Sequence, residues 1–237
     1  TIKKFLKDHL ANKFNGYLLG LSGGLDSSVL AKLTQDAVGN DKLLVLVMPC
    51  ESNPQDIIDA KLIIDRFNLR YKIIDLTPIY QTILKEYEKN SKDFEITENS
   101  KINLKVRLRM VTLYFYAASL NSLVLGTDNL SEYYTGYFTK YGDGAADLLP
   151  LVWLTKREVK EVAKLLEIPD EIINKTPTAG LVEGQTDEKE MGITYDELDD
   201  YLIGKIISPK AVQIIETLHK NSNHKREPIP RPIKFNR

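Results

Sequence analysis

A glycine-rich stretch at residues 20–28 (GLSGGLDSS) limits the possible folds of this chain more than any other feature. It follows the apolar run 17–19 and precedes a second apolar run at 29–33, so it is predicted to join a buried strand to a helix. Paired glycines leave an approaching anion unobstructed, and the first turn of a helix adds unpaired N–H groups at the positive end of its dipole. The stretch therefore predicts a phosphate-binding loop at the end of a strand.

Two better-known phosphate loops do not fit this stretch. It has neither the Lys of a Walker loop nor the third glycine of a dinucleotide fingerprint. A plain turn that caps a helix would explain Ser22, Gly23 and Gly24 alone, but the longer run after a buried strand favours the phosphate loop. Asp26 would repel phosphate unless a cation lay between them, so it predicts bound Mg²⁺.

Length, charge and cysteine content exclude several classes of function. The chain of 237 residues can hold one large domain or two small ones, and we expect a single domain over residues 1–237. Its 32 basic and 33 acidic side chains give a net charge of −1, so no overall field attracts nucleic acid or an anionic membrane. The single cysteine, Cys50, excludes an internal disulfide and a multi-cysteine metal site, and it fits a reducing compartment. No apolar run reaches the ~20 residues of a membrane span and no signal peptide is visible, so we expect a cytoplasmic protein.

Apolar runs recur in a regular order along the chain. The runs at 43–48, 71–76 and 123–125 are typical of parallel strands. Helical patterns lie between them, and a strongly apolar helix is expected from about Ile102 to Leu120, after a polar connector at 90–100. This order predicts an α/β fold with a doubly wound, mostly parallel sheet flanked by helices, which binds ligands at the carboxyl ends of its strands.

Two later segments place polar residues at predicted strand and helix ends. Residues 126–132 (GTDNLSE) follow the last predicted strand and continue into 135–147, which is too polar for a core element and too aromatic for a disordered linker. Loops of this kind usually bind a ligand. Thr155 and Glu158 form a capping box, which puts Lys156 in the first turn of a helix, where a cation is unfavourable unless it faces an anion.

Taken together, these segments resemble the ammonia-dependent NAD synthetases, a family of PP-loop ATP pyrophosphatases, over nearly the whole chain. The glycine-rich stretch alone indicates only the PP-loop group, whereas 135–147 is more specific because other PP-loop enzymes lack it. The other matching residues are Met48, Pro49, 53–56, 107–110, 126–129, 131–132, 154–156, 184–188 and 224–226.

The resemblance implies a reaction, a cofactor and an assembly. ATP, nicotinate adenine dinucleotide (deamido-NAD) and ammonia would give NAD, AMP and pyrophosphate, through a deamido-NAD adenylate, in the last step of NAD biosynthesis. The resemblance also implies Mg²⁺, a Rossmann-like fold of the adenine-nucleotide alpha hydrolase type, and a tight homodimer with deamido-NAD held across the subunit interface. Free ammonia would be the nitrogen donor, because the chain leaves no room for a glutamine-hydrolysing domain.

The resemblance further assigns roles to individual residues. Asp26 and Glu132 would be metal ligands, and Asp26 and Lys156 would be catalytic. ATP would contact Gly20, Leu21, Ser22, Gly23, Gly24, Leu25, Asp26, Ser27, Thr127, Lys156 and Thr178. Deamido-NAD would contact Arg107, Lys140, Asp147, His224 and Lys225. One position departs from the family pattern: Gly180 stands where members often carry Asp, so the role of that carboxylate cannot be transferred to this chain.

Two other classes of protein fit parts of the sequence. A different PP-loop enzyme, one that modifies tRNA or amidates a purine nucleotide, would share only residues 20–28, and the net charge of −1 argues against a tRNA substrate. A non-catalytic ATP-binding module would need the phosphate loop but neither the second carboxylate loop nor the segment 135–147. Pyrophosphate release from ATP with and without deamido-NAD would discriminate among the three classes.

Overall fold

The computed structural model describes residues 1–10, 13–178, 180 and 186–233. At its centre is a four-stranded parallel sheet with the strand order β3-β2-β1-β4. The strands are β1 (Gly16–Gly20), β2 (Leu43–Val47), β3 (Tyr71–Ile73) and β4 (Ser122–Leu125). The chain proceeds outward from β1 to β3 and then returns to place β4 on the other side of β1. The carboxyl ends of β1 and β4 therefore form a switch point, where open α/β sheets bind their ligands.

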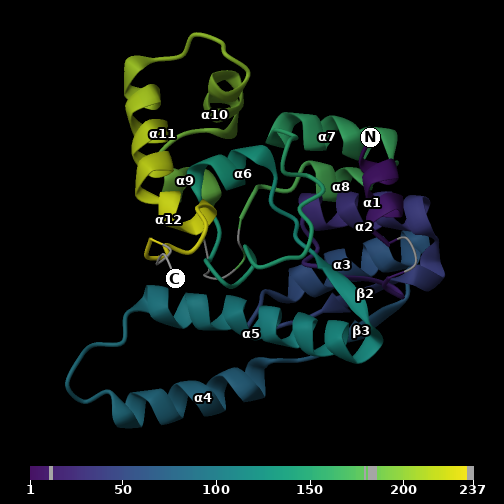
Figure 1. Ribbon diagram of the computed structural model, residues 1–237, viewed down its shortest axis with the longest axis horizontal. Helices are drawn as coiled ribbons and strands as arrows, with labels where there is room; N and C mark the ends of the chain where they lie inside the picture. The colour runs from purple at the N-terminus through teal and green to yellow at the C-terminus, as the bar shows by residue number, and fades with distance from the viewer. Residues whose placement is uncertain (11–12, 179, 181–185, 234–237) are drawn as a thin grey trace.

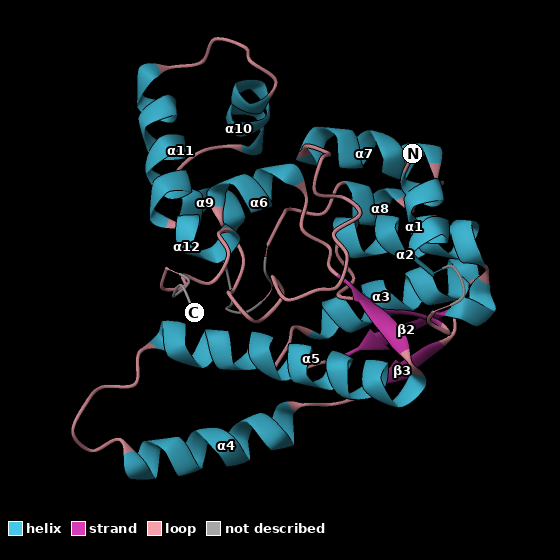
Figure 2. Cartoon of the chain, in the orientation of Figure 1, coloured by secondary structure: helices cyan, strands magenta, loops and turns pink. Residues whose placement is uncertain are grey.

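Helices cover both faces of the sheet, as Figures 1 and 2 show, which confirms the expected α/β fold. One face carries α1 (Ile2–Leu10), α2 (Leu25–Val38), α3 (Pro54–Phe67), α7 (Lys156–Leu165) and α8 (Asp170–Ile173), and the other carries α4 (Thr77–Asn90) and α5 (Glu98–Leu120). A short 3₁₀ helix, η1 (Asn40–Lys42), leads into β2.

The two sides of the core follow the alternation of side chains along the strands. Leu19 and Val45 are fully buried beneath the α2 layer, whereas Leu18 and Leu46 are fully buried beneath α5. Because both faces are covered, the strands appear in the sequence as continuous apolar runs rather than as alternating ones.

A third group of helices packs beyond the first layer and has a small core of its own, which includes Met191, Leu198 and Ile215. It consists of α6 (Leu130–Thr135), α9 (Asp187–Met191), α10 (Tyr195–Leu202), α11 (Pro209–Asn221) and α12 (Asn223–Arg226). Figure 1 shows α9 to α12 as the green and yellow end of the chain, at one side of the sheet layers, with the teal α6 next to them. Its α6 follows β4 closely, which brings the group to the switch point.

Two boundaries differ by three or more residues from those that the sequence predicted. The strand expected at 71–76 ends at Ile73, although Ile74 N and Leu76 N still donate to backbone oxygens of the segment that begins with β2. The connector expected at 90–100 is shorter, because Thr97 caps α5 by accepting a hydrogen bond from Ser100 N, and the helix starts at Glu98. In the part of the chain that the structure describes, no helix combines the length and the apolar character needed to cross a bilayer.

Candidate active site

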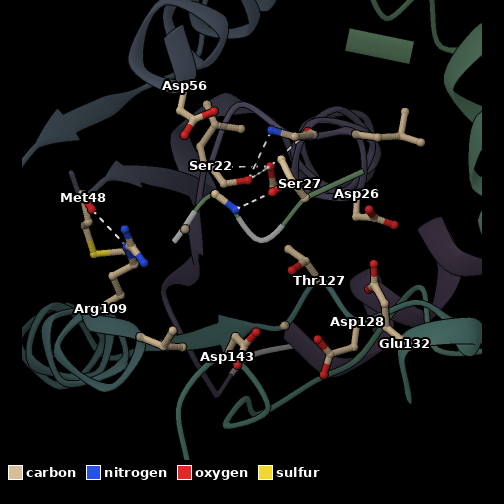
Figure 3. A pocket seen from close by; sticks show the side chains of 18 of the residues that line it. Ser22, Asp26, Ser27, Met48, Asp56, Arg109, Thr127, Asp128, Glu132 and Asp143 are labelled. Atoms are coloured by element: carbon tan, nitrogen blue, oxygen red, sulfur yellow. Dashed lines mark hydrogen bonds between the residues drawn. The ribbon is translucent and has the colours of Figure 1, made fainter. Parts of the chain in front are cut away.

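The glycine-rich stretch lies at the switch point, between the end of β1 and the start of α2. Gly23 has a φ of +79°, and a Cβ there would clash with the carbonyl oxygen of Asp56 on α3, so this position requires glycine. Ser22 Oγ lies 3.1 Å from Ser27 Oγ and accepts a hydrogen bond of 3.2 Å from Gly24 N, as Figure 3 shows. Ser27 Oγ also accepts from Ser22 N at 3.3 Å. These serine contacts hold the backbone of the turn in one conformation beside the cavity that the turn lines.

Three charged side chains from three elements meet beside this loop. Asp26 comes from the first turn of α2, Glu132 from the first turn of α6 and Lys156 from the start of α7. Lys156 Nζ lies 2.6 Å from Asp26 Oδ2 and 3.0 Å from Glu132 Oε1. Burial raises the pKa of Glu132 to about 7, with Lys156 opposing the shift and Asp26 adding to it. Burial acts to lower the pKa of Lys156, but the two carboxylates raise it overall.

Two capping boxes explain why these side chains lie together. Asn129 caps α6 by accepting from Glu132 N at 3.0 Å, and Asn129 Nδ2 donates to Asp26 Oδ1 at 2.9 Å. The predicted capping box that begins at Thr155 is confirmed, and it places Lys156 in the first turn of α7. Each of the three charged side chains therefore lies in the first turn of a helix, and the positions of these helix starts bring the three together.

Tyr195 on α10 contacts the charged group formed by Asp26, Glu132 and Lys156. The Lys156 ammonium lies 5.1 Å from the centre of the Tyr195 ring. The Tyr195 hydroxyl donates to Asp187 Oδ2 at 2.9 Å and lies 3.3 Å from Glu132 Oε1. The outer helical group is thus connected directly to the charged residues at the switch point.

A cavity of about 300 Å³ opens between the loop and these charges. It is lined by Glu132 and by every residue expected to contact ATP apart from Gly23, namely Gly20, Leu21, Ser22, Gly24, Leu25, Asp26, Ser27, Thr127, Lys156 and Thr178. In Figure 3, Asp26 and Glu132 lie on one side of the cavity, and Met48 and Arg109 lie on the other. The structure thus brings the residues expected at the ATP site around one space.

The five residues expected to contact deamido-NAD lie beside this cavity and do not belong to its lining. Four of them are connected around residues 136–140. Arg107 Nη2 donates to Lys140 O at 3.2 Å, and Lys140 Nζ donates to His224 O at 2.5 Å. Lys225 Nζ donates to backbone oxygens of the same segment at 2.6 and 2.7 Å. The fifth, Asp147, is held by other partners, and its Oδ2 accepts from Val124 N on β4 at 2.7 Å.

Sequence reasoning assigned no role to several other residues that line the cavity, including Arg109, Asp128, Asp143, Lys175 and Asp187. All except Lys175 belong to segments that carried the family resemblance. That resemblance was the signal by which the sequence could have identified them as residues of the site. Asp128 Oδ2 and Asp187 Oδ1 are buried without a hydrogen-bond partner among the described residues. Burial raises the pKa of Asp128 well above its usual range, and Asp143 adds to this shift. Burial therefore disfavours the ionised form of Asp128, a residue of the cavity wall.

The structure gives a physical reason for the departure at Gly180. Its φ is +63°, and a Cβ there would lie 3.1 Å from Asp56 Oδ2, so an Asp side chain would meet both strain and a like charge. Asp56 is paired with Lys175, whose Nζ lies 2.8 Å from Asp56 Oδ1 and 2.5 Å from Asp59 Oδ2. This ion cluster ties the start of the Thr178 loop to α3. The matching residues Gly184 and Gln185 lie outside the described part of the chain.

Comparison with known proteins agrees with this geometry. The chain matches the family model described as NAD synthase over residues 1–229. An NH₃-dependent NAD⁺ synthetase from Finegoldia magna is 46% identical to it over 227 residues, which cover 95% of this chain and 91% of that protein. The solved structure of an NMN synthetase from Francisella tularensis superposes with a TM-score of 0.92 at 42% identity, covering 98% of this chain and 96% of that one. An NH₃-dependent NAD synthetase from Campylobacter jejuni, in complex with nitrate, superposes with a TM-score of 0.78 at 32% identity and with the same coverage. The chain belongs to the NAD synthase family.

Proposed function

We propose that the chain, acting as a single domain over residues 1–237, amidates deamido-NAD to NAD with ammonia while cleaving ATP to AMP and pyrophosphate. The observation that carries this proposal is the convergence of Asp26, Glu132 and Lys156 beside a phosphate loop at the switch point. A carboxylate is a poor electrophile because oxide is a poor leaving group. In the first step a carboxylate oxygen of the substrate bonds to the α-phosphorus of ATP, and the bond from that phosphorus to pyrophosphate breaks. Ammonia then bonds to the carbonyl carbon, AMP leaves and the nitrogen loses a proton.

The side chains of this site act by binding and orientation. Backbone N–H groups of the glycine-rich turn and the start of α2 would hold the pyrophosphate portion of ATP. Lys156 would contact phosphate oxygens, because its ammonium already lies at the cavity wall beside the loop. The mechanism requires no nucleophilic side chain, since fixed geometry and charge bring the substrate carboxylate to ATP.

The residues present fit a divalent cation. Carboxylate oxygens of Asp26 and Glu132 face one point from two helices, and the Lys156 ammonium occupies that point as a positive charge. Among the described residues no group of three or more metal-ligating side chains is assembled, so phosphate and water would complete the coordination. We infer that Asp26 and Glu132 hold Mg²⁺, which would neutralise the charge that two anionic substrates bring together.

Product analysis tests the proposal. The purified chain is incubated with ATP, Mg²⁺, ammonium and deamido-NAD, and NAD, AMP and pyrophosphate are quantified. We expect equal amounts of the three products and no pyrophosphate when deamido-NAD is left out. A non-catalytic ATP-binding module would release none under either condition. A PP-loop enzyme for another substrate would form no NAD, and that result would refute the proposal.

The nitrogen donor has its own prediction. Because neutral NH₃ is the nucleophile, the rate at a fixed, subsaturating total ammonium concentration should rise with pH below the pKa of ammonium. Glutamine freed of ammonia should support only trace activity. Initial rates of NAD formation across a pH series check both statements, and efficient turnover with glutamine would contradict them.

We also infer that the functional unit is a homodimer built on α5. Phe115 and Val111 on this helix are 67% and 57% exposed, although they belong to its largely apolar half, from Met110 to Leu120. Apolar surface of this kind favours burial against a second copy of the chain in an isologous interface. Arg107 lies on the same helix, so a partner there would come close to the residues expected to hold deamido-NAD.

We place the enzyme in the cytoplasm. Support comes from Cys50, the single cysteine, which is a free and buried thiol.

A second candidate substrate is nicotinate mononucleotide, which lacks the adenylyl half of deamido-NAD. The observation that favours it is the closer superposition with the NMN synthetase, at a TM-score of 0.92 against 0.78 for the NAD synthetase. The reaction at the carboxylate would be the same. Measuring kcat/KM for both substrates in competition decides between them, because a preference for the mononucleotide would assign the chain to the second activity.

A further inference from the structure

Lys175 lies in the cavity wall between α8 and Thr178, and the mechanism above gives it no role. Its Nζ donates to Asp56 Oδ1 at 2.8 Å and to Asp59 Oδ2 at 2.5 Å, and it lies 3.5 Å from Gly23 O. An ammonium has three N–H donors, and these three acceptors account for all of them. Lys175 is therefore already paired within the protein and has no donor left for a ligand.

The charge balance at this place depends on the same ammonium. Burial acts to lower the pKa of Lys175, but its hydrogen bonds to the two carboxylates raise it overall, so the side chain stays a cation. Among the described residues, no other cation lies within ion-pair distance of Asp56 or Asp59. Arg109 interacts with Asp56 only from beyond that distance. Without Lys175, both carboxylates would lose their paired charge.

The two carboxylates belong to the part of α3 that is packed against the glycine-rich turn. A Cβ on Gly23 would come within 2.4 Å of Asp56 O and 2.9 Å of Asp59 Cβ, so no side chain fits between the turn and the helix. The side chains of Asp56 and Asp59 are 21% and 10% exposed, so solvent screens their charges only in part. Asp56 also lines the cavity, and Figure 3 shows it near the turn, away from Asp26. A phosphate held by the turn would therefore face two further negative charges.

This cluster differs in one respect from the cluster of Lys156 with Asp26 and Glu132. Both carboxylates of that cluster line the cavity, so a divalent cation that arrives with the nucleotide could replace the lysine as their partner. Asp59 does not belong to the cavity lining, so a cation that binds from the cavity would not reach both members of the Lys175 cluster. Lys175 is therefore expected to keep its partners when the nucleotide binds.

We propose that Lys175 is a positioning residue for nucleotide binding, which offsets the charges of Asp56 and Asp59 behind the glycine-rich turn and so allows the turn to accept phosphate. The inference rests on the proposed function only in taking ATP as the nucleotide. Lys175 contacts no phosphate itself and acts through the two carboxylates. The competing explanation is a mechanical tie between α3 and the segment that carries Thr178, which would matter equally for charged and neutral ligands of the cavity.

Ligands that differ in charge separate the two explanations. Binding of Mg²⁺–ATP by calorimetry and of adenosine by ligand-observed NMR titration is measured for the unmutated protein and for Lys175→Met, without deamido-NAD. We expect Lys175→Met to bind ATP at least about tenfold more weakly, because the uncompensated carboxylates repel the phosphates, and to bind adenosine within about twofold of the unmutated protein. If both ligands weaken by the same factor, or if neither weakens, the inference is wrong.

Removing the carboxylates together with the lysine gives a second readout. Lys175→Met combined with Asp56→Asn and Asp59→Asn leaves no charge in the cluster and should bind ATP at least as tightly as the unmutated protein. A mechanical tie predicts no recovery, and that result would overturn the proposal. Lys32→Met is the matched control, because the Lys32 side chain is 24% exposed, against 23% for Lys175, and pairs with Asp36 on α2, outside the cavity lining. It should leave the affinity for ATP unchanged.

A variant that keeps the lysine covers the case in which a Lys175→Met protein does not fold by thermal melting. Asp56→Asn with Asp59→Asn should bind ATP more tightly than the unmutated protein and adenosine equally well, because only the repulsion of phosphate is removed. Unchanged or weaker binding of ATP would contradict the proposal. Failure of NAD formation would refute the proposed function, but it would leave these binding comparisons intact.

Discussion

At the scale of single residues, the site is organised by charges that depend on one another. Lys156, Asp26 and Glu132 are each at most 14% exposed at the side chain, so none of them is stable as a charge without the others. The Asn129 amide holds Asp26 in place from the other side. Removing one carboxylate therefore changes the charge of the site without removing much volume.

Asp26→Asn and Glu132→Gln should each lower kcat/KM for NAD formation by at least about a hundredfold, because loss of a metal ligand removes several kcal/mol of charge stabilisation. Steady-state kinetics at saturating Mg²⁺ and circular dichroism measure the activity and the fold. Asp8→Asn, at an exposed ion pair on α1, is the matched control and should retain full activity. Near-normal rates in both site variants would show that the carboxylates do not hold the cation.

At the scale of elements, the junction of α6, α7 and α10 keeps the charged residues in position. Asp199 on α10 is 1% exposed, and it accepts from Ser131 Oγ at 2.6 Å and from Arg157 N at 2.7 Å. The same Ser131 hydroxyl accepts from Lys156 N at 3.2 Å. One buried carboxylate therefore connects the starts of α6 and α7.

Asp199→Ala should lower the free energy of unfolding by about 2–3 kcal/mol, because it leaves the buried N–H of Arg157 and the Ser131 hydroxyl without their acceptor. Urea denaturation measures this change. Asp200→Ala removes the neighbouring carboxylate, which is more exposed and pairs with Arg157 on the surface, and it should have a much smaller effect. Equal effects of the two variants would contradict the assigned role of Asp199.

The sequence predicted mainly those features that arise from residues close together in the chain, and it missed those that depend on contacts between distant segments. The glycine-rich turn and the capping box at Thr155 are local patterns, and both were correctly placed. The capping box at Asn129 is equally local but was not recognised, and it is what aims Glu132 at Asp26. The contacts of Arg109 with Met48 and Ser52 could not be predicted, because they depend on how the fold brings α5 against the segment after β2, from which it is far in the sequence.

At the scale of the whole molecule, α5 has one covered and one uncovered side. Ala117 is buried against the sheet, and Tyr114 is held within its own chain by a hydroxyl contact of 3.5 Å to Asp147. Phe115 and Val111 point away from this core and are largely exposed. Phe115 is therefore the better position at which to test assembly.

Phe115→Glu should convert a dimer into a monomer with low activity, because a charge cannot be buried unpaired in an apolar interface. Sedimentation velocity at micromolar concentration measures the assembly. Leu165→Glu, at an 83% exposed position on α7, is the control and should leave the mass unchanged. If the unmutated protein is a fully active monomer at this concentration, the proposed dimer is wrong.

The position of Lys156 between Asp26 and Glu132 has a consequence for the order in which ligands arrive. A free divalent cation would have to displace the ammonium, and no other acceptor for Lys156 Nζ is recorded among the described residues. Incoming phosphates would give that ammonium a new partner and bring the cation with them. The protein should therefore bind the Mg²⁺–ATP complex but bind Mg²⁺ alone only weakly, whereas Lys156→Met should take up Mg²⁺ by itself. Calorimetric titration of both proteins with Mg²⁺ alone would show whether the lysine prevents metal from entering before the nucleotide.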